Sequence, residues 1–176
     1  MSAIIDGSVG SQFPTTIGVG GATPSTSGAG ITFPATQSAS SDANTLDDYE
    51  EGTFTPVIEG DSTAGTGTYS TQTGNYTKVG NRVLVNLQLR WTAHTGTGNM
   101  IIKTLPFTSG SGATVCAGYL ANFASLTSPA NEIKQWYLSA NSTTINLESV
   151  PVAGGGTTAL AMDTNAGITL TFQYQV

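Results

Sequence analysis

The chain has 176 residues and a formal net charge of −6, and 9% of its residues are charged, where an ordinary soluble protein has about 25%. The negative charge argues against nucleic acid as a partner, because such binding depends on clustered Lys and Arg. No segment approaches the ~18 consecutive apolar residues of a membrane span. We therefore expect neither nucleic acid nor membrane as a partner, and one compact domain with an appendage.

The low charge itself favours assembly into oligomers. Thr, Ser, Gly and Asn occupy the surface positions that Lys and Glu usually take. Neutral hydroxyl and amide groups can be buried against another subunit at a lower desolvation cost than ammonium or carboxylate groups. The composition thus predicts that the chain has copies of itself as a partner.

Residues 1–45 are rich in Gly, Ser, Thr, Ala and Pro and contain no Lys or Arg. Their few apolar side chains cannot close a core, and ordering each residue costs roughly 1–2 kcal/mol. We expect a long extended N-terminal arm that becomes ordered only where it binds another surface. The expected anchors are Ile4, Ile5, Phe13, Ile17, Ile31 and Phe33.

The charges are placed unevenly along the chain. Seven carboxylates crowd residues 42–61, whereas all five cations lie after residue 77. Two interpretations remain open: the acidic segment is a solvated linker, or it docks on the basic strands within one subunit or across to a neighbour. The candidate groups for such charge contacts are Asp47, Asp48, Glu50, Glu51, Lys78, Arg82 and Arg90.

Residues 46–176 are patterned as β-strands. A first strand is expected over Thr53–Ile58, and its internal Pro56 suits a sheet edge or a bulge. Asn75–Val79 and Arg82–Trp91 flank Gly80-Asn81, a two-residue turn typical of a tight hairpin. In the second of these strands apolar and polar residues alternate, broken only by Leu84, so one of its faces is predicted to be core.

Similar alternation recurs towards the C-terminus. The further strands that we expect are Met100–Leu105, Thr114–Leu120, Ile133–Leu138, Thr143–Leu147 and Ile168–Val176. About eight short strands with Gly-, Asn- and Ser-rich connections, and no convincing amphipathic helix, indicate an all-β protein. The predicted fold is an antiparallel β-sandwich, jelly-roll-like or related, over residues 46–176.

Few residues are candidates for catalysis or metal binding. The single histidine, His94, is expected in a loop after the Trp91 strand and has no partner that would make it a catalytic base. The single cysteine, Cys116, is interpreted as a small buried residue within a strand. Aromatic side chains are expected in the core or at subunit contacts. The sequence thus predicts no enzyme, no metal and no cofactor.

Several stretches of the chain carry a resemblance. Residues 31–56 read ITFPATQSASSDANTLDDYEEGTFTP, and residues 74–83 read GNYTKVGNRV. They are followed by WTAHTGTGN at residues 91–99 and LPF at residues 105–107. Over roughly residues 31–108 this combination resembles virion proteins of tailed bacteriophages. The resemblance implies a non-enzymatic, trimeric β-structured component of the particle, in a module found both in tail fibres and in proteins that decorate heads.

Within that class, the short chain with its long arm favours a capsid decoration or cement protein. It starts at Met1 and shows neither heptads nor a repeating shaft. We expect a homotrimer that is made in the host bacterial cytoplasm and lies on the outer surface of the capsid, where it stabilises the head. The arm would then contact the major capsid protein or another virion protein. The alternative is a tail-fibre or adhesin subunit, in which case a host surface glycan becomes a partner.

Overall fold

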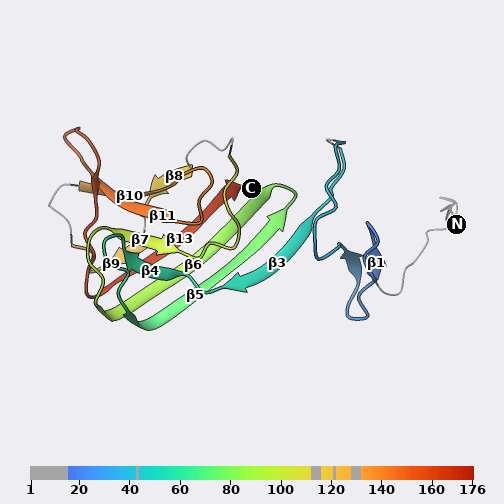
Figure 1. Ribbon diagram of the computed structural model, residues 1–176, viewed down its shortest axis with the longest axis horizontal. Helices are drawn as coiled ribbons and strands as arrows, with labels where there is room; N and C mark the ends of the chain where they lie inside the picture. Colours follow the sequence, from blue (N-terminus) through green and yellow to red (C-terminus); the bar gives the residue numbers. More distant parts are fainter. Residues whose placement is uncertain (1–15, 43, 112–115, 121, 128–131) are drawn as a thin grey trace, which may run out of the picture. The chain divides into compact units, whose positions relative to one another are not determined.

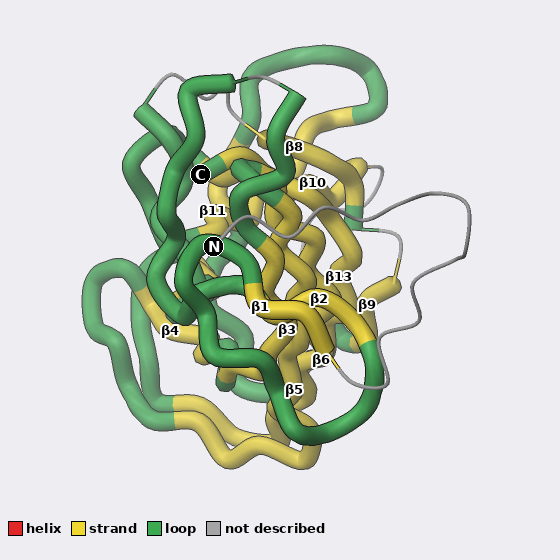
Figure 2. Tube along the Cα trace, turned by 90° about the vertical axis from the view of Figure 1, so that its right-hand side faces the viewer, coloured by secondary structure: helices red, strands yellow, loops and turns green. Residues whose placement is uncertain are grey.

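A computed structural model describes residues 16–42, 44–111, 116–120, 122–127 and 132–176. The described residues form strands, turns and loops without a helix (Figure 2). The chain divides into two compact units, Met1–Glu50 and Glu51–Val176. The sequence placed the boundary after residue 45, just before the strand Tyr49–Phe54, which spans the division.

Two antiparallel sheets make up the larger unit (Figure 1). Sheet I has the strand order β3-β5-β6-β13-β9, formed by Tyr49–Phe54, Gly67–Val79, Arg82–His94, Ala166–Gln175 and Asn122–Ala124. Sheet II has the order β4-β7-β11-β10-β8, formed by Val57–Gly60, Met100–Lys103, Ile145–Pro151, Glu132–Leu138 and Cys116–Tyr119. A short strand β12, Thr158–Ala159, also pairs with β11. The predicted all-β, antiparallel sandwich is confirmed.

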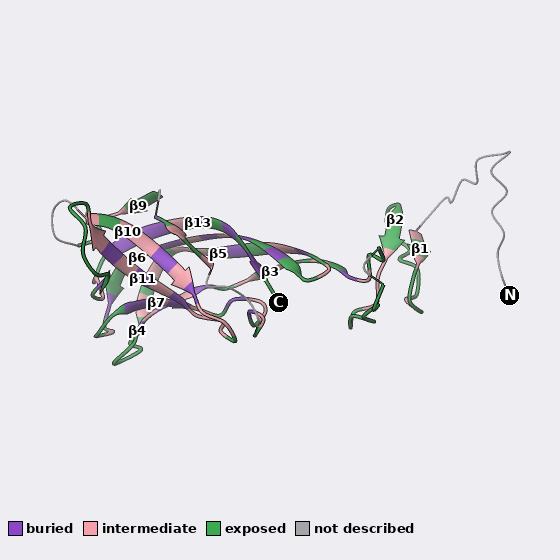
Figure 3. Cartoon of the chain, turned by 90° about the horizontal axis from the view of Figure 1, so that it is seen from above, coloured by how far each residue is buried: buried purple, intermediate pink, exposed green. Residues whose placement is uncertain are grey.

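The core lies between the two sheets, and strands β6 and β13 supply much of it (Figure 3). The predicted alternation in β6 is confirmed, because every second side chain from Val83 to Trp91 is buried. These residues pair in register with the inward side chains of β13, for example Leu87 with Leu170. From sheet II, Trp136 packs its ring 4.8 Å from the ring of Phe172, which joins the two layers.

The hairpin between β5 and β6 forms as predicted. Val79 pairs with Arg82 across the turn, and Gly80 has a φ of 55°, which favours glycine. Strand β5 begins at Gly67, eight residues earlier than expected from the sequence. The extra length was missed because residues 67–74 are mostly Thr, Ser, Gln and Gly and lack apolar alternation, so their pairing depends on the partner strand β6.

The prediction of one strand over Thr53–Ile58 is wrong. Strand β3 ends at Phe54 in sheet I, and β4 begins at Val57 in sheet II. Pro56 has no N–H and cannot donate to a ladder, so the ladder is interrupted where the chain crosses from one sheet to the other. The proline therefore marks a sheet switch and not an edge within one strand.

The N-terminal unit contains two strands that the sequence did not predict. β1, Thr16–Gly18, pairs in parallel with β2, Gly30–Thr32, and Ile17 lies opposite Ile31. Strands of three residues are too short to show a periodicity. Together with β4, β9 and β12 they raise the number of strands in the described residues to thirteen, above the expected eight.

Candidate functional site

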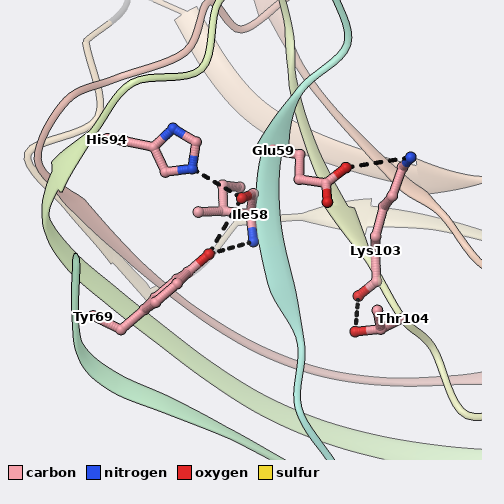
Figure 4. Close-up of polar contacts among 6 residues, drawn as sticks. All are labelled: Ile58, Glu59, Tyr69, His94, Lys103 and Thr104. Carbon is pink, nitrogen blue, oxygen red and sulfur yellow. Dashed lines mark hydrogen bonds and ion pairs between the residues drawn. The ribbon is translucent and has the colours of Figure 1, made fainter. Parts of the chain in front are cut away.

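His94 is a structural residue at the end of β6 and not a loop residue, which corrects the sequence-based placement. Its side chain is buried. The Gly96 N–H donates to Nδ1 over 2.9 Å, so the ring proton lies on Nε2, which donates to the carbonyl oxygen of Ile58 over 3.0 Å. The Tyr69 hydroxyl also binds the Ile58 backbone (Figure 4). Nε2 thus ties β6 of sheet I to β4 of sheet II, while Nδ1 binds the backbone just after the end of β6.

Cys116 is only partly buried, whereas the sequence predicted a buried residue. Cys116 lies on β8, where its Sγ donates to the carbonyl oxygen of Gln173 over 3.0 Å, and burial raises the pKa of the thiol. A raised pKa leaves less of the reactive thiolate.

In the part of the chain that the structure describes, no three His, Cys, Asp or Glu side chains gather as metal ligands would. A helix able to cross a membrane is not found there either.

Tyr174 closes the end of the sandwich near Phe107. Its hydroxyl donates to the Phe107 carbonyl oxygen over 2.9 Å and accepts from the Phe107 N–H over 3.2 Å. Burial raises the pKa of Tyr174 to about 12 from its usual value of 10.0. The folded protein therefore stabilises the neutral form of the Tyr174 hydroxyl.

This environment predicts a loss of stability at high pH. Because the pKa of Tyr174 is higher in the folded than in the unfolded state, its contribution is complete below pH 10 and is lost as the pH rises towards 12. A shift of this size corresponds to about 2–3 kcal/mol. Between pH 9 and pH 11.5, the free energy of unfolding measured with urea should fall clearly less for Tyr174→Phe than for the wild-type protein. An equal drop in both proteins would contradict the assignment.

The expected arm anchors are in part visible. Ile4, Ile5 and Phe13 lie outside the described residues. Ile17 and Ile31 are neighbours across the β1–β2 pair and are 39% and 58% exposed. Phe33 is half-buried, with its ring 6.3 Å from that of Tyr49. With Val19, Pro34 and Leu46 it helps to line a cavity of about 160 Å³.

The acidic residues occupy different environments. Asp47 accepts hydrogen bonds from the Ser40 N–H over 2.7 Å and from the Gln37 amide over 3.2 Å, so it organises its own loop. Asp48 is buried, and Glu50 and Glu51 lie on β3. Their docking on basic strands, within a subunit or between subunits, stays a prediction.

The basic residues that the sequence grouped together lie on two faces of sheet I. Lys78 is buried on the core side, with its ammonium 5.5 Å from the centre of the Phe107 ring. Arg82 and Arg90 are exposed and lie on the outer side, towards opposite ends of β6. Their role in contacts between subunits also stays a prediction.

Between the two arginines, the outer side of sheet I carries an uncharged surface that we call the amide–hydroxyl face. It consists of outward side chains from β5, β6 and β13 in three cross-strand rows: Thr73–Gln88–Thr169, Asn75–Asn86–Thr171 and Thr77–Leu84–Gln173. Six of these residues, Thr73, Asn75, Asn86, Gln88, Thr169 and Thr171, line a groove of about 250 Å³. The sequence indicated that Asn86 and Gln88 point away from the core. The partners across the strands were missed, because Thr171 lies 85 positions after Asn86.

The fold places the chain among antiparallel β-sandwich proteins with one apolar core. No protein-family model and no curated protein matches the sequence. Among solved structures, the crystal structure of Dettilon tailspike protein (gp208) is similar, with a TM-score of 0.56 and 22% sequence identity. The match covers 72% of this chain and 24% of the tailspike chain. At this level of identity the likeness establishes a shared fold.

Proposed function

We propose that this chain is a non-enzymatic structural protein of a tailed-bacteriophage particle and that it assembles as a homotrimer. The resemblance of residues 31–108 to phage virion proteins supports this function, as does the fold shared with part of a tailspike protein. In this role the protein acts mechanically, through contacts with copies of itself and with other virion proteins.

The contrast between the two units carries the proposal. In the part that the structure describes, the larger unit has a core of twenty buried apolar side chains, although a few others, such as Leu84 and Tyr119, remain exposed. Among the described residues of the N-terminal unit, the one buried side chain is Asp48, while Ile17, Val19, Ile31 and Leu46 remain exposed. Apolar side chains without a core of their own favour binding to another surface. The N-terminal unit is accordingly the attachment segment of the proposal.

As a capsid decoration protein, the chain would lie on the outer surface of the head, with this segment on the major capsid protein. Each contact is weak, but three linked copies bind together far more persistently than one. The sandwich and the attachment segment then reinforce the shell against the pressure of packaged DNA.

Cryo-electron microscopy of phage particles, with and without the gene for this protein, tests the proposal. We expect trimeric density on the head that is missing from the deletion particles, and heads that release DNA at a lower temperature. Adsorption to host cells should be unchanged. Heads of equal heat resistance, with density missing from the tail, would overturn the decoration role.

A second candidate function is a tail-fibre or tailspike subunit that binds the host surface. It is favoured by the structural neighbour, which is a tailspike protein. In this case the deletion phage should keep robust heads and lose adsorption, and the isolated protein should bind the host's surface polysaccharide. Catalysis belongs to neither proposal, and unchanged polysaccharide after incubation with the protein is the expected result.

A further inference from the structure

Both outer sides of the sandwich carry charged residues, but on sheet I Arg82 and Arg90 lie towards the ends of β6, outside the amide–hydroxyl face. On sheet II, Glu59 pairs with Lys103 over 3.3 Å, and Glu148 accepts from the Gln135 amide over 3.2 Å. Covering these charged groups carries a high desolvation cost. The amide–hydroxyl face of sheet I has no charged residue at any of its nine positions. It is therefore the face that another protein covers at the lower cost.

Hydrogen bonding on the amide–hydroxyl face is only partly satisfied by the protein itself. The Thr171 hydroxyl donates to the Asn86 Oδ1 over 2.7 Å, and the Asn86 Nδ2 donates to the Asn75 Oδ1 over 3.3 Å. This row is held in place across three strands. Among the described residues, the side chains of Gln88 and Gln173 make no hydrogen bond. The face thus has a fixed centre and free donors and acceptors around it.

Such a face is complementary to itself. An amide group carries both donors and an acceptor, and so does a hydroxyl group, so two copies of one face can satisfy each other. A face that carried net charge would instead repel its copy. The occupant that best fits these nine positions is a second copy of this chain.

Leu84 supplies the apolar part of this surface. It lies on β6 between Asn86 and Arg82, at the position where the alternation of the strand is broken, and is 46% exposed. Interfaces commonly combine apolar contacts with polar groups around them. Leu84 supplies such an apolar contact in the row of the face nearest to Arg82, with Thr77 and Gln173 beside it.

We propose that the amide–hydroxyl face is the contact surface between subunits, with Leu84 as its apolar anchor and the Asn75–Asn86–Thr171 row as its hydrogen-bonding centre. The inference rests on the proposed homotrimer. In a closed trimer the same face of each copy turns towards the threefold axis and meets both neighbours. The outer side of sheet II then faces solvent or other virion proteins.

The full-length protein and four variants test this surface by light scattering after size-exclusion chromatography over a dilution series. Leu84→Glu and Asn86→Asp place carboxylates on the proposed contact. Ile133→Glu and Asn146→Asp are matched controls on sheet II, since Ile133 is 40% exposed and Asn146 points outward from β11. Far-UV circular dichroism verifies that each variant is folded.

Wild-type protein should have three times the mass of the 18.0 kDa chain. Leu84→Glu brings like charges together at the contact, so the trimer of this variant should dissociate at a concentration roughly a hundredfold or more above that of the wild type. Asn86→Asp should act in the same direction, and both controls should remain trimeric.

Each other outcome rejects a defined part of the inference. A monomeric wild-type protein overturns the homotrimer and this contact together. If the wild-type protein is a trimer and the Leu84→Glu and Asn86→Asp trimers dissociate at the same concentration as the wild-type trimer, the proposed contact is overturned. The homotrimer then stands. Dissociation of Ile133→Glu alone moves the contact to sheet II.

Discussion

Replacing Trp136 by Ala is expected to lower the free energy of unfolding by about 3–5 kcal/mol, the range for removing a large aromatic side chain from a core. Trp136 lies on β10 of sheet II and packs on Phe172 of sheet I, so its loss opens a cavity between the layers. The site is tight, because a Cβ added at Gly118 would lie 3.0 Å from the indole ring. Gly118, the neighbour of Trp136 on β8, has no side chain that could turn into the space left by the ring.

Urea unfolding followed by circular dichroism measures this effect, at one protein concentration because oligomer stability depends on concentration. Trp136→Phe keeps most of the ring contact and should lose clearly less stability. Tyr119→Ala removes another aromatic side chain from sheet II, but one that is 69% exposed, and should change stability by about 0.5 kcal/mol or less. Similar losses in Trp136→Ala and Tyr119→Ala would show that Trp136 does not join the sheets.

The parts of the fold that the sequence predicted are those with a repeated local signal. In β6 and β13, apolar side chains at every second position mark the core face, and Gly80-Asn81 marks the turn. These signals need no knowledge of the partner strand. The inward and outward sides of β6 and β13 were therefore assigned correctly.

The parts that were missed depend on contacts between distant segments. The N-terminal half of β5 has no apolar alternation and is a strand because β6 lies beside it. Likewise, the outward direction of Asn86 could be predicted, but its bond to Thr171 follows from the pairing of β6 with β13. A surface built from three strands is thus visible only once their register is known.

Deleting residues 1–45 is expected to abolish attachment of the protein to the phage particle while leaving the sandwich folded. The core residues begin at Ile58, and the cut keeps the whole of β3. The thermal midpoint of the truncated protein should therefore stay within about 4 °C of the full-length value, which corresponds to less than roughly 2 kcal/mol for a domain of this size. Binding to particles that lack the protein, measured by sedimentation and gel analysis, should disappear.

A substitution separates anchoring by side chains from the mere presence of the segment. Ile31→Asp removes an exposed apolar side chain, whose burial in a partner would be worth about 1.5–3 kcal/mol, and should weaken binding roughly tenfold or more. Ser27→Asp adds the same charge at an exposed polar position of the same unit and serves as the control. If both variants lose binding to the same extent, charge and not apolar contact governs attachment; if neither loses binding, Ile31 is not an anchor. If the truncated protein still binds fully, the attachment surface lies on the sandwich, and the N-terminal unit loses its proposed role.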